Sequence, residues 1–231
     1  MPNPKVSVII PTMNEEKAVG AVMDAVHEAL KPTGWPYEVL IVDTSSKDKT
    51  REIASSKGAI VVDEPRRGYG RAYKTGFEKA RGDYIATLDA DCTYPAEDIP
   101  KFVEILEKDE LDFITGDRLS QMKKGVMSGT HKLGNWVLVK TSNILFGTKL
   151  RDSQSGMWVF RRSIIPKLNL VSDKMALSEE IKIEVKLKGL KMREIPIEYR
   201  PREGEVKLNT WRDGTGNLKY MWRKKFGKAR D

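Results

Sequence analysis

Short apolar runs alternate with helical patterns along the first part of the chain. The runs lie at residues 6–11, 38–43, 59–62 and 83–88 and are rich in Val and Ile, which favour β-strands. Helical patterns separate them at residues 17–30, 50–57 and 68–80. Strands and helices that alternate in this way form a doubly wound sheet. We therefore predict an α/β protein with a mostly parallel, Rossmann-like central sheet and helices on both faces.

Polar side chains follow these runs at the points where the predicted strands end. Thr12 and Asn14 follow the first run, Asp43 ends the second, and Asp89 and Asp91 follow the fourth. Because ligands bind at the carboxyl ends of strands in open α/β sheets, we expect these side chains to gather at one edge of the sheet. Asp43 taken alone is equally well explained as a turn residue that caps the next helix.

The two aspartates at the end of the fourth run stand one residue apart, shortly before Pro95. Carboxylates this close repel each other and are costly to bury unless a cation lies between them. Magnesium is typically held by one or two carboxylates together with phosphate oxygens. Asp89 and Asp91 therefore suggest a metal–diphosphate site, and the alternative is an ordinary polar loop after a strand.

The remainder of the chain continues the same alternation and then becomes basic. We predict helices at 98–108, 132–146 and 178–188, and strands at 111–116, 157–160 and 192–199. A basic segment begins at Arg200 and runs to the end. The 231 residues fit one large domain, or one domain with an appendage.

The overall charge favours an anionic partner. Lys and Arg total 41 against 33 Asp and Glu, so the net charge is +8. Nucleic acid, a phosphorylated metabolite and an anionic lipid surface all fit this balance. The single Cys92 excludes an intrachain disulfide framework and fits a reducing compartment. No secretory signal is visible and no apolar run approaches the ~18 residues that span a bilayer, so any membrane contact should be peripheral or come through a partner protein.

An ordered set of short motifs extends from residue 5 to about residue 202. The motifs are residues 8–15, Val42-Asp43 with Ser46 and Asp48, Gly68-Tyr69-Gly70 with Ala72 and Gly76, Asp89-Ala90-Asp91 with Pro95, Gly116-Asp117-Arg118, Asp152 with Ser155-Gly156, and residues 194–199 with Arg202. Each motif is weak singly, but the ordered set is specific. It resembles family 2 of the inverting GT-A glycosyltransferases, and within it the polyprenyl-phosphate hexose synthases of the dolichol-phosphate mannose synthase type.

The resemblance implies a reaction. A hexose would pass with inversion from a nucleotide-diphosphate sugar, GDP-mannose or UDP-glucose, to dolichyl or polyprenyl phosphate, making a lipid-linked sugar donor for glycosylation. Mg²⁺ or Mn²⁺ would be held by Asp89 and Asp91. A phosphate acceptor is already an anion near neutral pH, so no strong general base is required.

The resemblance also implies roles for individual residues. The acceptor phosphate would be bound by Arg118 and Lys132, which with Asp91 make up the catalytic set. Asp43 would accept an N–H from the base. The implied donor-binding residues are Pro11, Thr12, Asn14, Glu15, Asp43, Gly68, Asp89, Ala90, Asp91 and Arg202. The chain departs from the family at Thr44, where a second aspartate is usual, and at Thr93, where the mannose synthases carry glutamine.

We expect a GT-A catalytic domain over residues 1–202 and a basic, membrane-proximal extension over 203–231. The protein would be cytoplasmic and peripheral on the cytoplasmic face of the membrane, with an integral-membrane partner as a further route to the lipid. Two alternatives are a glycosyltransferase with a soluble sugar acceptor and a nucleic-acid-binding α/β protein that stacks bases on Trp211, Tyr220 and Trp222. The second leaves the strand-end carboxylates unexplained, so we expect no nucleic acid partner.

Overall fold

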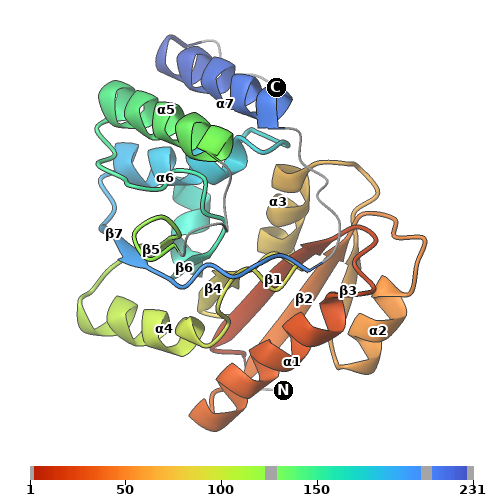
Figure 1. The fold of residues 1–231 in the computed structure, drawn as a ribbon. Coiled ribbons are helices and arrows are strands. Elements are labelled where there is room, and N and C mark those ends of the chain that lie inside the picture. The colour runs from red at the N-terminus through yellow and green to blue at the C-terminus, as the bar shows by residue number, and fades with distance from the viewer. Residues whose placement is uncertain (1–2, 123–128, 204–209, 228–231) are drawn as a thin grey trace.

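A seven-stranded sheet forms the centre of the molecule (Figure 1). The computed structural model describes residues 3–122, 129–203 and 210–227. The strand order is β3-β2-β1-β4-β6-β5-β7, and β6 is antiparallel to both of its neighbours, β4 and β5. The other pairs are parallel, which confirms the predicted fold class. The strands are β1 (Val6–Thr12), β2 (Tyr37–Asp43), β3 (Ile60–Asp63), β4 (Tyr84–Thr87), β5 (Phe113–Asp117), β6 (Trp158–Arg161) and β7 (Met192–Pro196).

Helices cover both faces of this sheet. One core cluster joins the sheet to α1, α2 and α4, and a second joins its other face to α3 and α6. The helices are α1 (Val19–Leu30), α2 (Thr50–Ser56), α3 (Tyr69–Lys79), α4 (Asp98–Lys108), α5 (Gly129–Phe146), α6 (Leu177–Leu187) and α7 (Thr210–Lys225). Short 3₁₀ turns cover Lys31–Thr33 and Arg162–Lys167.

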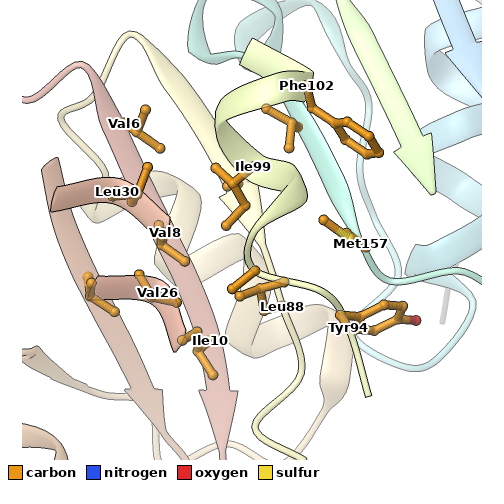
Figure 2. Close-up of a cluster of buried hydrophobic side chains, with 14 of the residues drawn as sticks. Val6, Val8, Ile10, Val26, Leu30, Leu88, Tyr94, Ile99, Phe102 and Met157 are labelled. Carbon is orange, nitrogen blue, oxygen red and sulfur yellow. The ribbon is translucent and has the colours of Figure 1, made fainter. Parts of the chain in front are cut away.

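The central strand β1 carries apolar residues on both of its faces. Val8 and Ile10 point into the cluster under α1 and α4, together with Val26 of α1 (Figure 2). Ile9, between them, belongs to the cluster on the opposite face. A strand buried on both faces has no face exposed to solvent, so its sequence does not alternate between apolar and polar residues as that of a half-exposed strand does.

The C-terminal segment forms a helix that the sequence analysis did not predict. In Figure 1, α7 (blue) lies beside α5 (green), and both lie outside α6. Leu138 of α5, Ile183 of α6 and Met221 of α7 make a third, small apolar cluster. The division at residue 202 stays a prediction. The basic residues Lys207, Lys228 and Arg230 lie outside the described residues.

The start of α1 differs from expectation. A polar Asn14 before a helical pattern is typical of an N-cap, but α1 begins at Val19, and its N-cap position, Ala18, has no side-chain cap hydrogen bond. Asn14 instead has a positive φ of 55°, and its Oδ1 accepts the backbone N–H of Lys47. The asparagine amide therefore joins two loops at the strand ends instead of capping the helix.

Close packing of α3 against the sheet depends on Gly76. A Cβ atom at this position would lie 2.5 Å from Cγ2 of Ile9. We expect Gly76→Ala to lower the free energy of unfolding by about 1–3 kcal/mol, the usual cost of overpacking a core. Gly134→Ala is the matched control in α5, where a Cβ would have nothing within 4 Å. It should stabilise the helix by about 0.5–1 kcal/mol. Urea denaturation measures both, and equal midpoints would contradict the packing argument.

Candidate active site

A cavity of about 790 Å³ lies where β1 and β4 end. Most of the residues predicted to bind the donor lie in its wall. They are Pro11, Thr12, Glu15, Gly68, Asp89, Ala90, Asp91 and Arg202. Asn14 and Asp43 are not part of the wall, and neither are Arg118 and Lys132. The structure thus brings together one continuous set of the predicted residues and leaves four of them outside the cavity surface.

Asp91 is held by neighbours on both sides. Its Oδ2 lies 2.7 Å from Nη2 of Arg202, and its Oδ1 accepts the Thr93 hydroxyl at 2.6 Å. The backbone N–H of Glu203 donates to the carbonyl oxygen of Asp91. The segment after β7 therefore runs beside the Asp89–Asp91 loop, and this is how Arg202, far away in sequence, reaches the carboxylate. Thr93, the departure from the family pattern, orients Asp91.

Asp89 faces the cavity and has few donors. Its Oδ1 accepts the Tyr73 hydroxyl at a long 3.4 Å. Burial, and then the negative charge of Asp91, raise the pKa of Asp89 to about 7. The positive charges of Arg202 and Arg118 act in the opposite direction. The surroundings of Asp89 thus disfavour its ionised form, and additional positive charge in the cavity would favour it.

This donor set fits a divalent cation. Two carboxylates from one loop face a cavity, and the charge of Asp91 adds to the effect of burial in raising the pKa of Asp89. Mg²⁺ and Mn²⁺ accept such a pair and take their other ligands from phosphate oxygens and water. Within the described residues, no group of three or more His, Cys, Asp and Glu side chains is arranged to hold a metal. Asp89 and Asp91 could therefore hold the ion only together with a substrate phosphate or water.

Asp43 ends β2 directly opposite Thr12 of β1, as expected for neighbouring parallel strands. It is fully buried and accepts hydrogen bonds from the Thr12 hydroxyl at 3.0 Å and the Ser46 backbone N–H at 3.0 Å. Thr44, one residue later, reaches the cavity wall. Asp43 fixes the loops that follow β1 and β2, and its contact with a base stays a prediction.

The glycines before α3 serve close packing between two loops. A Cβ on Gly68 would lie 2.2 Å from the Asp173 carbonyl oxygen, and one on Gly70 would lie 2.5 Å from that of Ser172. Arg71 also donates its backbone N–H to Asp173. The loop before α3 and the loop before α6 are thereby joined at the cavity wall. Donor binding by Gly68 stays a prediction.

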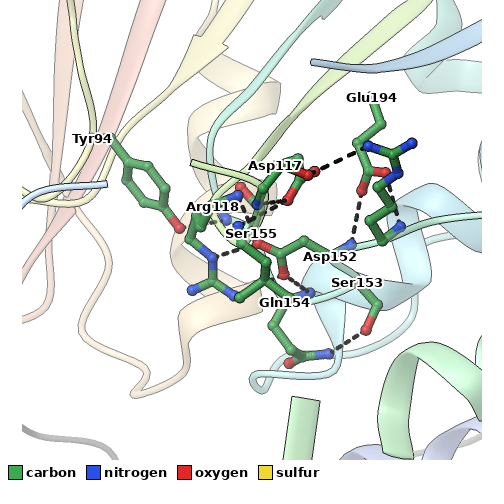
Figure 3. A network of polar contacts seen from close by, with 12 residues as sticks. Tyr94, Asp117, Arg118, Asp152, Ser153, Gln154, Ser155 and Glu194 are labelled. Carbon is green, nitrogen blue, oxygen red and sulfur yellow. Dashed lines mark hydrogen bonds and ion pairs between the residues drawn. The ribbon is translucent and has the colours of Figure 1, made fainter. Parts of the chain in front are cut away.

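Arg118 forms a buried pair with Asp152 (Figure 3). Its Nε donates to Oδ2 at 2.7 Å and its Nη2 to Oδ1 at 2.9 Å, a bidentate geometry. Burial alone would raise the pKa of Asp152, but the charge and hydrogen bonds of Arg118 lower it below its usual value. No partner of the remaining Nη1 was found among the described residues.

A buried lysine supports the loop that carries Asp152. Lys182 of α6 donates from Nζ to the carbonyl oxygens of Ser153 and Ser155, at 2.8 and 2.9 Å. Burial lowers the pKa of Lys182 to about 8. Glu194 of β7 accepts the backbone N–H groups of the same loop (Figure 3). The sequence analysis missed Lys182, because nothing in its local pattern separates it from a solvent-exposed lysine.

Several cations of the cavity wall were also missed. Lys132, which was predicted, is exposed near the start of α5. The wall instead contains Arg67, Lys174, Lys219 and Arg223. The last two belong to α7, which the sequence analysis treated as an extension outside the catalytic domain. In the sequence, Lys219 and Arg223 were indicated only by the general basic character of the C-terminal segment.

Comparison with known proteins identifies the family. Residues 7–168 match the family model described as Glycosyl transferase family 2. The low-salt glycan biosynthesis hexosyltransferase Agl6 of Haloferax volcanii is 39% identical over 220 residues, which is 94% of this chain and 53% of that protein. The chain thus spans about half the length of this relative. A dolichyl-phosphate hexose transferase of the same organism is 32% identical over 90% of this chain and 88% of its own length.

Solved structures agree on the fold. Glucosyl-3-phosphoglycerate synthase from Mycobacterium tuberculosis, crystallised with Mn²⁺, uridine diphosphate and glucosyl-3-phosphoglycerate, superposes with a TM-score of 0.78 at 18% identity. The match covers 99% of this chain and 81% of that one. At this identity the likeness concerns the fold alone. The family match and the curated relatives lead to one conclusion: the chain belongs to glycosyl transferase family 2.

Proposed function

We propose that the protein transfers a hexose, with inversion, from a nucleotide-diphosphate sugar to dolichyl or another polyprenyl phosphate. The observation that carries the proposal is the Asp89–Asp91 pair in the wall of a cavity that also contains basic side chains. Such a cavity suits two phosphorylated substrates held close together. Relatives named as a dolichyl-phosphate hexose transferase and a dodecaprenyl-phosphate galacturonate synthase support a lipid phosphate as acceptor.

The donor is proposed to be GDP-mannose or UDP-glucose. Its diphosphate would lie beside Asp89 and Asp91, with Arg202 turning from Asp91 toward the phosphate oxygens. A bound Mg²⁺ or Mn²⁺ would neutralise the diphosphate and so make it a better leaving group. Pro11, Thr12 and Glu15 would line the nucleotide side of the cavity. Asp43 would accept an N–H from the base, and Asn14 and Asp43 would hold the loops around it.

The acceptor needs positive charge more than it needs a base. A phosphate monoester has a second pKa near ~6, so its oxygen is already nucleophilic at neutral pH. Arg118 is proposed to present Nη1 to this phosphate, because Asp152 holds Nε and Nη2 of the guanidinium in place. Lys132, exposed at the start of α5, would approach from the lipid side. Such cations act by orientation and by stabilising charge.

Access to a lipid acceptor is proposed to involve the outer face of α5. Leu133, Trp136 and Ile144 are 63%, 57% and 80% exposed, and with Lys140 they recur every three or four residues along one stripe. Apolar residues next to lysines are typical of a helix that lies in a membrane interface. We therefore propose peripheral association with the cytoplasmic face of a membrane. None of the helices within residues 3–122, 129–203 and 210–227 combines the length and apolarity that crossing a bilayer requires.

The reaction and its metal are tested together with a donor panel. Radiolabelled GDP-mannose or UDP-glucose is incubated with dolichyl phosphate, and the label extracted into organic solvent is measured with and without a chelator. We expect Asp89→Asn and Asp91→Asn each to lower turnover about a hundredfold or more, because several kcal/mol of charge stabilisation are lost.

The matched control for these variants is Asp63→Asn. Asp63 ends β3 opposite Asp43 but pairs with Arg51 at the surface and is absent from the cavity wall. Its replacement should leave turnover unchanged. Transfer that a chelator does not affect would contradict the metal assignment. Label that appears only on a water-soluble acceptor would contradict the lipid acceptor.

Membrane association is tested by sedimentation with anionic vesicles. The double variant Trp136→Ser/Ile144→Ser should bind about tenfold more weakly or worse, because burying each large apolar side chain contributes about 1.5–3 kcal/mol. Leu187→Ser is the control, since Leu187 is 55% exposed on α6, outside the stripe. Binding should also fall at about 1 M salt, where screening reaches ~3 Å. A wild-type protein that ignores such vesicles at low salt would instead point to recruitment by an integral partner.

A further inference from the structure

The helix α7 forms part of the cavity wall. Gly216, Lys219, Tyr220 and Arg223 face the cavity and recur at helical spacing. Side chains three and four residues apart lie on the same face of a helix. The face that contains Lys219 and Arg223 is therefore directed at the space next to Asp89 and Asp91, and no role for it follows from the reaction described so far.

This helix is held in place by specific contacts. The Tyr220 hydroxyl donates to Glu180, and Nζ of Lys224 lies 2.7 Å from Oε1 of Glu184. Nδ2 of Asn217 donates to Oε1 of Gln154 at 2.9 Å, and Met221 is fully buried. Lys219 and Arg223 are thus presented from a fixed scaffold, so little further ordering is needed when they bind an anion.

The cations of the cavity fall into two groups. Arg202 is paired with Asp91, on the side where the donor diphosphate is proposed to bind. Lys219 and Arg223, like Arg67 and Lys174 elsewhere in the wall, form no ion pair with any described residue. Unpaired cations at the edge of a cavity attract an anion, and the donor diphosphate already has a place beside the aspartates. The other anion of the proposed reaction is the acceptor phosphate, whose proposed ligands Arg118 and Lys132 lie outside the cavity wall.

An apolar stripe runs beside these cations. Trp222 and Phe226 are 54% and 63% exposed, and their rings stack with centroids 5.3 Å apart. Each follows one of the cations by three residues, so the two stripes are adjacent on the surface of α7. A pair of cations next to exposed aromatic rings is complementary to an amphiphile, with a phosphate head and an apolar chain. A small soluble phosphate would use only the cations.

We propose that Lys219 and Arg223 bind the phosphate of the polyprenyl acceptor, and that Trp222 and Phe226 contact the first part of its chain. The inference rests on the proposed function and adds the two cations of α7 to Arg118 and Lys132, the phosphate ligands proposed there. In the reaction, an oxygen of this phosphate forms a bond to C1 of the hexose while the bond from C1 to the donor diphosphate breaks. The two cations orient the attacking phosphate and neither gain nor lose a proton.

The test separates acceptor binding from donor binding. The full-length double variant Lys219→Gln/Arg223→Gln is assayed with dolichyl phosphate in detergent, and its affinity for UDP and GDP with Mn²⁺ is measured by calorimetry. We expect KM for dolichyl phosphate to rise about tenfold or more, because charge-assisted hydrogen bonds contribute more than the ~1.4 kcal/mol that corresponds to that factor. Nucleotide affinity should stay within about twofold, since the proposed donor site is untouched.

Two further variants complete the design. Lys225→Gln removes a charge from the same helix, but Lys225 lies over the Phe146 ring and not in the cavity wall. Its KM should equal that of the wild type. Trp222→Ser/Phe226→Ser should raise KM for dolichyl phosphate and leave KM for a short-chain alkyl phosphate unchanged. Circular dichroism of each variant checks that the helix content is retained.

Three results would overturn the inference. The first is a KM for dolichyl phosphate that does not change in the Lys219/Arg223 double variant. The second is a rise of this KM in the Lys225 variant as large as in the double variant. The third is a loss of nucleotide affinity in the double variant as large as its rise in KM. A wild-type protein that transfers no hexose to polyprenyl phosphate would instead refute the proposed function. The site is then judged by direct binding of dolichyl phosphate, followed by tryptophan fluorescence. Loss of that binding in the double variant supports the site, and retained binding rejects it.

Discussion

Two like charges at the end of one strand govern the construction of the cavity. Asp89 and Asp91 cannot both be buried as anions without compensation, and the raised pKa of Asp89 records the cost. The surrounding structure supplies that compensation from distant parts of the chain. Arg202 pairs with Asp91 and Tyr73 donates to Asp89, while the charge of Arg118 acts on Asp89 from its pair with Asp152. A divalent cation bound together with a diphosphate would compensate the remaining negative charge of the two aspartates.

Other buried charges fix the loops around this centre. Glu64, directly after β3, accepts from Arg71 and Thr75 of α3, so the start of that helix is tied to the end of the strand. Glu180 accepts the backbone N–H groups of Val171 and Ser172 and also the hydroxyl of Tyr220. The carboxylate of Glu180 therefore links the cavity wall to α7. Breaking a buried contact of this kind leaves an unpaired charge, which makes these loops well-defined walls for a ligand site.

The arrangement of α7 gives the cavity two chemically different sides. The side near the sheet contains the aspartates and the strand-end loops, and the side near α7 contains Lys219 and Arg223 without acidic partners among the described residues. A glycosyltransferase must hold two substrates with their reacting atoms in contact, and two anions placed together repel. Separate groups of positive charge, one for each substrate, offset that repulsion and orient both partners.

The sequence alone was enough to predict the sheet and the edge at which the site lies. The alternation of strands and helices, and the placing of Thr12, Asp43, Asp89 and Asp91 at strand ends, are local patterns that depend only on neighbours along the chain. Only the tertiary structure showed that Arg118 is held by Asp152, that Asn14 joins two loops, and that α7 packs beside α5 and α6. These features depend on contacts between residues far apart in sequence, such as Lys224 with Glu184. No local periodicity specifies such contacts, because they form only where folded surfaces complement each other in shape and charge.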